Sequence, residues 1–520
     1  MAEWRVFWVP RAGAHPGVRG ALLEDWKDLE ERQRSVGVKP GDPIFLAPDH
    51  RVDGLLGLYV QCGSFRRHTP ETKRNYATDI CLFLTFLWGR GVVWEQAVER
   101  DLEDFEHWRR FAPENPRLIG GSKWNRELAA LTGMYAWAAG TGRIQRSPVA
   151  TRQVAGPYGS VVAPVARAKN ARGSNVHWLT PRAFRRWAEV GLRGHGRDGV
   201  VLPGWSGRLE DRNVAFVDLL YSSGMRRSEA GSLLVFEVPQ RRLEGGRYCV
   251  GRIAAAVTRS KKPRTFYVAS GVVGEIETYV DSSRALAVRR AQQAGRYEGL
   301  GEVRIVTDVL GGVRPTVRWR DRSGAGGERR LTDLAVADRM TLYTEGQHGL
   351  EPLWLWLNER GLPLWVDSWE GVFRTANDRC REVLTPPESR FRDPHRVYAP
   401  YATPHACRNS FALYMLVVLN HLMDRRFGLT PEERRDFRLL YGDPWRMVQD
   451  LLGHASRETT CSIYLAPVAD LQLRALLAVA DDADVPGPGS LDGVFARLAR
   501  ESEGIQDLDD LMLPALGGSA

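Results

Sequence analysis

A segment without helical periodicity, residues 151–178, constrains the fold of this chain more than any other feature. It is rich in Gly, Ala, Val and Pro, and it carries the basic side chains Arg152, Arg167, Lys169 and Arg172. Such a composition is typical of a linker between domains. Because one hydrophobic core rarely serves more than about 250–300 residues, we expect the 520 residues to form two or three domains, with a boundary at this basic linker.

The segment before the linker, residues 55–150, is predicted to be a small helical domain. Thr69 supplies an N-cap and Pro70 takes the first helical position, a combination that starts helices. Apolar side chains then recur on one face of the predicted helix, at Tyr76, Ile80, Phe83, Leu84 and Leu87. Residues 1–54 show no clear periodicity, so we expect an irregular N-terminal extension there.

The distribution of charge favours a polyanion as partner. The formal net charge is +9, although residues 481–520 form an acidic tail with nine acidic residues against two arginines. The rest of the chain is therefore strongly basic, which is typical of nucleic-acid binding, and the alternative is an arginine-rich solvated surface. The side chains expected to contact DNA from the helical domain and the linker are Arg66, Arg67, Lys73, Arg74, Lys123, Arg126 and Lys169.

The segment after the linker, residues 179–480, is predicted to combine helices with one small sheet. Residues 247–268 favour strands, with a hairpin turn inside them, and helices are expected from 368 to 480. Residues 296–345 contain several glycines among charged residues and resemble an inserted or partly flexible segment. The expected fold class is therefore α+β, mainly α with a small antiparallel β-sheet.

Membrane and disulfide-stabilised classes are not expected. The longest apolar run, residues 411–419, has nine residues, about half of what a bilayer span requires. Six cysteines lie far apart without a C-x-x-C pair, which is typical of reduced thiols in a cytoplasmic protein rather than of a zinc site or a disulfide framework.

Two short segments carry candidate site residues, and the first has the geometry of a phosphate-binding site. In residues 403–408, Thr403 and Pro404 start a helix, and His405 and Arg408 lie three positions apart on one face of it. A helix N-terminus also favours an anion through its unpaired N–H groups. The alternative is an ordinary structural helix, because an H-x-x-R pair also arises by chance. In residues 451–464, His454 follows a helix-ending glycine and precedes Tyr464 by ten positions.

Together with residues 222–229, these two segments resemble the three signature boxes of the tyrosine recombinase, or phage integrase, family. The resemblance covers residues 55–480, because the 55–150 helices are similar to the SAM-like core-binding domain of that family. It implies a C-shaped clamp of two domains around double-stranded DNA and strand cleavage through a 3′-phosphotyrosine without metal, ATP or other cofactor. It also implies a homotetramer in a synaptic complex, alone or with other recombinases, that serves site-specific recombination or the integration of a mobile element in the cytoplasm, at the nucleoid.

The resemblance assigns a role to each matching residue. Tyr464 is the nucleophile, Arg226 and Arg408 hold the non-bridging phosphate oxygens, His454 adds a hydrogen bond, and His405 takes part in proton transfer with the tyrosine. These residue types suit the chemistry, because cations favour the phenolate of a group whose ordinary pKa is about 10. Arginine also presents a fork of donors that a lysine lacks.

The general acid for the departing 5′ oxygen is expected on the turn 259–262. Strict alignment with many family members places Arg259 there, whereas other members use the residue that corresponds to Lys261. After Lys169 the chain contains only two lysines, Lys261 and Lys262. We therefore predict Lys261 as the catalytic residue, with Lys262 as the alternative, and expect Arg259 and Lys262 to contact DNA.

Structural alternatives remain beside these roles. Arg226 could simply pair with Glu229, or the adjacent Arg227 could face the phosphate instead. His454 could cap a helix, and Tyr464 could be a packed aromatic. Lys261 could be a solvated turn residue. At the level of function, the alternatives are a DNA-binding accessory protein that has lost cleavage, and a topoisomerase of type IB.

Overall fold

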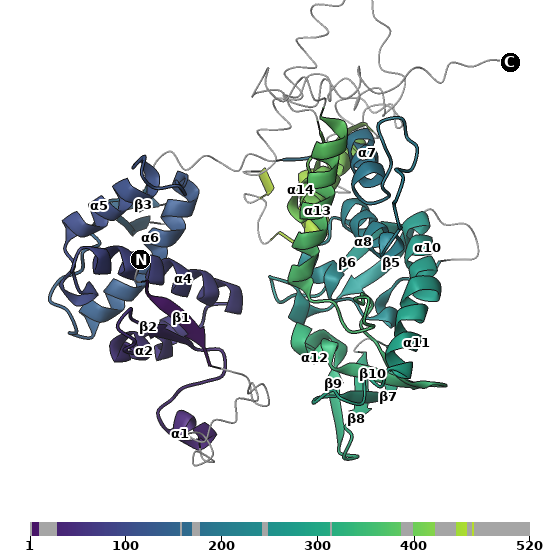
Figure 1. Cartoon of the computed structure of the whole chain (residues 1–520), viewed down its shortest axis with the longest axis horizontal. Coiled ribbons are helices and arrows are strands. Elements are labelled where there is room, and N and C mark those ends of the chain that lie inside the picture. Colours follow the sequence, from purple (N-terminus) through teal and green to yellow (C-terminus); the bar gives the residue numbers. More distant parts are fainter. Residues whose placement is uncertain are drawn as a thin grey trace, which may run out of the picture. The chain divides into compact units, whose positions relative to one another are not determined.

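The described residues of this computed structural model fall into two units, Met1–Gly173 and Ser174–Ala520 (Figure 1). The structure describes residues 3–9, 29–156, 159–168, 177–241, 248–312, 315–385, 399–421, 444–454 and 460–461. Tyr464, Lys169, the predicted helices after 461 and the acidic tail 481–520 lie outside these ranges.

Five helices form most of the first unit, and their bounds are Gly54–Gln61 (α2), Gly63–Arg66 (α3), Pro70–Gly89 (α4), Glu99–Arg110 (α5) and Gly121–Gly140 (α6). The predicted start of α4 is confirmed, since Thr69 accepts a hydrogen bond from the Thr72 backbone N–H at 3.2 Å and Pro70 follows it. The predicted apolar face of α4 packs against α6, where the buried rings of Phe83 and Tyr135 have centroids 6.2 Å apart.

Residues 1–54, expected to be irregular, contain a short antiparallel strand pair where the structure describes them. Strand β1 (Arg5–Trp8) pairs with β2 (Pro43–Leu46), and α1 (Leu29–Ser35) lies between them in the chain. Phe45 is buried in the core of the unit, and the Trp4 backbone N–H donates to Thr85 of α4 at 3.0 Å. Two four-residue strands that pair across more than thirty residues give no periodicity in the sequence, which explains the wrong expectation.

The segment expected to be the linker, residues 151–178, begins as a β-hairpin of the first unit. Strands β3 (Thr151–Gly156) and β4 (Gly159–Pro164) pair in antiparallel register. The indole N–H of Trp124 then donates to the Ala166 carbonyl at 2.8 Å, and Asn125 exchanges two hydrogen bonds with Ala168. The structure thus corrects the linker prediction over 151–168, because the same Gly and Val residues that favour a linker also favour a short hairpin.

The second unit is built around α8 (Glu210–Ser223), whose apolar side chains are buried on several sides. The other described helices of this unit are α7 (Pro181–Gly191), α9 (Arg227–Gly231), α10 (Ser270–Tyr279), α11 (Ala285–Gln293), α12 (Val336–Met340), α13 (Trp369–Leu384), α14 (Pro404–His421) and α16 (Pro444–Leu452). Helices α10 and α14 pack directly on α8, and α16 packs on α14. Helix α14 therefore joins the core to α16.

The predicted strand pair is confirmed as β5 (Tyr248–Ile253) and β6 (Arg264–Ala269), which form an antiparallel hairpin. One face of the hairpin is buried against the core of the second unit, through Cys249, Phe266 and Val268. The connection between the strands runs from 254 to 263 and contains a short 3₁₀ turn, Ala255–Val257. It is therefore longer than the predicted turn.

Residues 296–345, expected to be a partly flexible insertion, form most of a five-stranded sheet. Its strands are β7 (Arg304–Leu310), β8 (Thr316–Arg320), β9 (Gly326–Arg330), β10 (Leu342–Gly346) and β11 (Gly349–Pro352), in the order β11-β10-β7-β8-β9. The β7–β10 pair is parallel and the others are antiparallel. The predicted fold class, with one small antiparallel sheet, therefore omits this mixed sheet.

Cross-strand ion pairs explain why this sheet does not show in the sequence. Arg318 pairs with Glu328 at 2.7 Å, and Arg320 pairs with Glu345 at 2.8 Å, so these strands carry charged residues on one face. Charged residues on a solvated sheet face have the composition of a loop. In the part of the chain that the structure describes, no helix combines the length and apolar composition that crossing a membrane requires.

Candidate active site

The segment 403–408 forms the predicted helix start, at the N-terminus of α14. The hydroxyl oxygen of Thr403 accepts a hydrogen bond from the Ala406 backbone N–H at 3.0 Å, and Pro404 is the first helical residue. This geometry fixes His405 and Arg408 in the first turns of α14, three positions apart. His405 remains exposed, whereas Arg408 is buried with 3% of its surface accessible.

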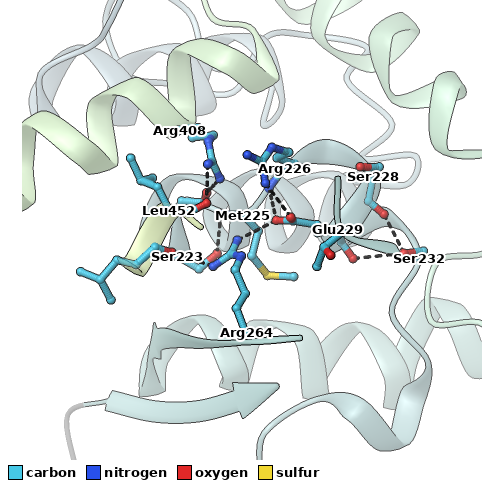
Figure 2. A network of polar contacts seen from close by, with 12 residues as sticks. Ser223, Met225, Arg226, Ser228, Glu229, Ser232, Arg264, Arg408 and Leu452 are labelled. Carbon is cyan, nitrogen blue, oxygen red and sulfur yellow. Dashed lines mark hydrogen bonds and ion pairs between the residues drawn. The ribbon is translucent and has the colours of Figure 1, made fainter. Parts of the chain in front are cut away.

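Arg408 connects three helices through its guanidinium group (Figure 2). One Nη donates to the Gly224 carbonyl at 2.6 Å, and the other donates to the Leu452 carbonyl at 2.5 Å. Gly224 caps the end of α8, and Leu452 is the last residue of α16. Carbonyl groups at helix ends lack intrahelical donors and carry partial negative charge, so they suit a buried cation. Arg408 therefore contacts Gly224, the residue two positions before Arg226 in the chain.

Two glycines make this close approach possible. Gly224 and Gly453 have φ angles of +62° and +65°, which disfavour other residues. A Cβ atom on Gly224 would lie 2.3 Å from the Phe411 ring, and one on Gly453 would lie 2.8 Å from Cδ of Arg264. The predicted end of a helix at Gly453 is confirmed. Its turn continues with the His454 backbone N–H donating to the Gln449 carbonyl at 3.1 Å, as in a Schellman motif.

Arg226 precedes α9 and pairs with the buried carboxylate of Glu229. Its Nη1 lies 2.9 Å from Oε1 of Glu229, and its backbone N–H donates to Oε2, also at 2.9 Å. Arg226 therefore does form the ion pair with Glu229 that was considered as the structural alternative to its predicted role. The ion pair does not bury the guanidinium group of Arg226, which keeps 23% of its side-chain surface accessible, whereas Glu229 has none. The neighbouring Arg227 pairs elsewhere, with Asp367 and Glu370.

Arg264 belongs to the same cluster, although it was absent from the predicted site. Its Nη2 donates to Oε2 of Glu229 at 2.6 Å and its Nη1 donates to the Leu451 carbonyl at 2.7 Å. Figure 2 shows Arg226 and Arg264 directed at Glu229 from above and from below. The sequence offers one signal for Arg264 as a site residue, which is its position at the start of β6, directly after the turn. That signal is weak in a chain with 65 arginines.

The two histidines lie in the field of these arginines. The pKa of His405 is lowered by partial desolvation and by Arg408, Arg226 and Arg259. The pKa of His454 is lowered to about 4, by desolvation first and then by Arg408, Arg226, Arg264 and His405. His405 lies in the same helix start as Arg408, and His454 follows the end of α16 whose Leu452 carbonyl accepts from Arg408, so both imidazoles belong to the same site. Neutral imidazole can accept a proton or a hydrogen bond.

The turn after β5 places its three basic residues differently. Arg259 is exposed and is one of the cations that act on His405. Lys261 has a φ of +55°, and its Nζ donates to the Ala256 carbonyl at 2.9 Å, within the same connection. Lys262 is exposed. The role of Lys261 as general acid stays a prediction, and Arg259 has the clearer connection to the histidine.

The predicted nucleophile lies outside the described residues, but the chain is described close to it. Thr460, four positions before Tyr464, is fully buried, and its Oγ1 lies 2.9 Å from Nδ1 of His454. His454 thus contacts the segment that leads to Tyr464.

The predicted DNA contacts of the first unit divide into two groups. Arg66 donates to Asp42 at 3.3 Å, and Lys123 and Arg126 both pair with Asp79, which is 2% exposed. The structure thus gives these three cations acidic partners inside their own unit. The other described residues of the prediction are Arg67 and Arg74, which are exposed, and Lys73, which is half-buried.

The cluster is suited to an anion rather than to a cation. It brings together guanidinium groups, two imidazoles and one carboxylate that is already paired. Within the described ranges, no three His, Cys, Asp or Glu side chains are grouped in a way that could hold a metal ion.

Comparison with known proteins gives structural neighbours but no relatives in sequence. No family model matches the chain, and no curated protein matches it. The structure is similar to XerA recombinase, with 14% identity and a TM-score of 0.26, over 79% of this chain and 92% of that chain. It is also similar to the XerH site-specific recombinase in a post-cleavage complex with a palindromic difH substrate, with 12% identity and a TM-score of 0.38, over 81% and 85%. Similarity at these TM-scores carries no weight for the function.

We predict that His454 is uncharged at neutral pH. Its folded-state pKa of about 4 lies below the value of about 6.5 in an unfolded chain. The unfolded state therefore binds more protons between these values, and the stability from this residue, complete above about pH 6.5, is lost as the pH falls toward 4. The measurement is a ¹³C-histidine NMR titration, with the signal assigned by His454→Gln. The urea-unfolded chain, titrating near 6.5, is the control, and a folded-state pKa above 6 would contradict the prediction.

Proposed function

We propose that this protein is a site-specific DNA recombinase of the tyrosine type, which cleaves and rejoins DNA strands through a 3′-phosphotyrosyl intermediate. One observation carries the proposal: Arg226, His405, Arg408 and His454, predicted from three distant segments, lie in one cluster around the ends of α8, α14 and α16. A chance motif in one of these segments would not bring the other two beside it.

The cluster supports a binding site for one phosphodiester group. The accessible part of the Arg226 guanidinium group offers donors to a non-bridging oxygen. Arg408 adds a second positive charge, held in place by its two carbonyl acceptors. As the phosphorus becomes five-coordinate, negative charge grows on these oxygens. Fixed donors in a partly desolvated site stabilise that charge better than water does.

The proposed reaction conserves the number of phosphoester bonds. The phenol oxygen of Tyr464 attacks the phosphorus, and the bond from phosphorus to the 5′ oxygen breaks. His405 accepts the phenol proton, a role that its lowered pKa favours because the imidazole is then neutral. The 5′ oxygen leaves as a hydroxyl after a general acid of the 259–262 turn protonates it. A 5′-hydroxyl from another strand reverses these steps and completes the exchange.

The remaining parts of the proposal concern partners. We propose that the first unit contacts the duplex through Arg67, Lys73 and Arg74, and that the two units form a clamp on double-stranded DNA. We further propose that four copies assemble when two duplexes recombine, and that this takes place in the cytoplasm. Each neutralised phosphate should contribute about −0.9 to the slope of log affinity against log salt concentration.

We predict that the wild-type protein forms a covalent adduct with a nicked DNA substrate from which the cleaved end diffuses away. Tyr464→Phe should abolish the adduct because it removes the nucleophile. Arg408→Ala should lower the cleavage rate at least about 10²-fold, as does the loss of one oxyanion donor. The adduct is measured on a denaturing gel. Tyr267→Phe, at an exposed tyrosine of β6, is the matched control and should cleave normally.

The contrary outcomes separate the alternatives. DNA binding without an adduct on any substrate would favour the accessory protein. Relaxation of supercoiled plasmid without strand exchange would favour the topoisomerase.

We predict that a better leaving group identifies the general acid of the turn. Lys261→Ala should slow cleavage of ordinary DNA, and a substrate with sulfur in place of the 5′ bridging oxygen should restore the rate, because a thiolate leaves without protonation. The same rescue is measured for Arg259→Ala and Lys262→Ala. Rescue at one of these positions and not at Lys261 would identify that residue, instead of Lys261, as the general acid.

A further inference from the structure

Glu229 is a buried carboxylate that two arginines share. It has no accessible surface, and its oxygens lie 2.9 Å from Nη1 of Arg226 and 2.6 Å from Nη2 of Arg264. Burial alone would raise its pKa, but Arg264 and Arg226 outweigh burial and lower it. The carboxylate is therefore charged in the folded protein, and it needs both cations to offset the cost of removing it from water.

The second guanidinium donor of Arg264 joins this pair to the end of α16. It donates to the Leu451 carbonyl at 2.7 Å, next to the Leu452 carbonyl that accepts from Arg408. The stem of Arg264 also fills the space beside Gly453, where a Cβ atom would approach its Cδ to 2.8 Å. Arg264 thus contacts Glu229 of α9 on one side (Figure 2) and the end of α16, which precedes His454, on the other.

We infer that Arg264 is a positioning residue that couples the placement of Arg226 to that of His454, through Glu229 and the Leu451 carbonyl. The inference rests on the proposed function, because it concerns how the phosphate-binding groups are held. Arg264 is itself 9% exposed at its side chain and has both Nη groups engaged inside the protein. It also lies on the opposite side of the Glu229 carboxylate from Arg226 (Figure 2), so it acts through its neighbours rather than on the substrate.

Charge gives a second reason for an arginine at this position. Arg226 and Glu229 alone form a neutral pair, which would attract a phosphate weakly. With Arg264 the group of three carries one net positive charge, so Arg226 stays an effective cation for an anionic ligand. A lysine could supply the charge, but its single nitrogen lacks the rigid fork that spans both acceptors.

The test compares Arg264→Met and Arg264→Lys with the matched control Arg252→Met. Arg252 lies on the partner strand β5, across from Thr265, and is exposed. Single-turnover cleavage of the nicked DNA substrate is followed by adduct formation, and the DNA dissociation constant is measured in the same buffer. We expect Arg264→Met to cleave about 10²-fold more slowly with affinity within about twofold of wild type, Arg264→Lys to be intermediate, and Arg252→Met to match wild type.

Two readouts distinguish positioning from a loss of folded protein. Misfolding would lower the final amount of adduct while the remaining molecules react at the wild-type rate, whereas positioning lowers the rate. The NMR titration of His454 gives an independent readout, since Arg264 is one of the cations that lower its pKa. We expect that pKa to rise in Arg264→Met and to stay unchanged in Arg252→Met.

The outcomes are separable from those of the proposed function. If wild type forms the adduct and both Arg264 variants cleave as fast as Arg252→Met, the inference is overturned and the recombinase proposal stands. If wild type forms no adduct, the recombinase proposal fails, and an unchanged His454 pKa in Arg264→Met would overturn the coupling as well. If Arg264→Met does not fold, Arg264→Lys decides, and a wild-type rate in that variant would overturn the inference.

Discussion

The buried carboxylate of Glu229 is the constraint around which the candidate site is organised. A charge without accessible surface is strongly unfavourable unless it is paired and hydrogen-bonded, and its partners come from two separate elements. Arg226 precedes α9, and Arg264 begins β6. The pairing requires α9 and the hairpin to approach each other. The same contact orients Arg226, so the stability of the core and the geometry of the site have one cause.

Helix ends explain how several cations tolerate one another in this cluster. Arg408 and Arg264 donate to the carbonyls of Gly224, Leu451 and Leu452, at the C-terminal ends of α8 and α16. These carbonyls supply fixed partial negative charge without a mobile side chain. The arginines are therefore held in place before any ligand is present. A bound anion would relieve their mutual repulsion. Desolvation, together with these arginines, lowers the pKa of both histidines and so favours their neutral form.

The sequence predicted the parts of the site that depend on local rules. An N-cap followed by proline located the start of α14, and glycine located the end of α16. Arg264 could not be singled out, because its partners are a carboxylate 35 positions away and a carbonyl 187 positions away. The strand pairs before 54, at 151–164 and in the five-stranded sheet were missed for a related reason. Their strands are short or bear ion-paired charges, and pairing between distant strands leaves little periodicity. The chemical roles, including that of Tyr464, remain predictions.

The most direct test of the proposed mechanism identifies the atom of the chain that becomes linked to DNA. The trapped complex is digested with nuclease and trypsin, and the peptides are analysed by mass spectrometry. The tryptic peptide 458–474 contains a single tyrosine, Tyr464. The account predicts a nucleotide joined to that tyrosine through its 3′ phosphate. A nucleotide on any other peptide, or DNA bound at saturation with every tryptic peptide unmodified, would contradict it.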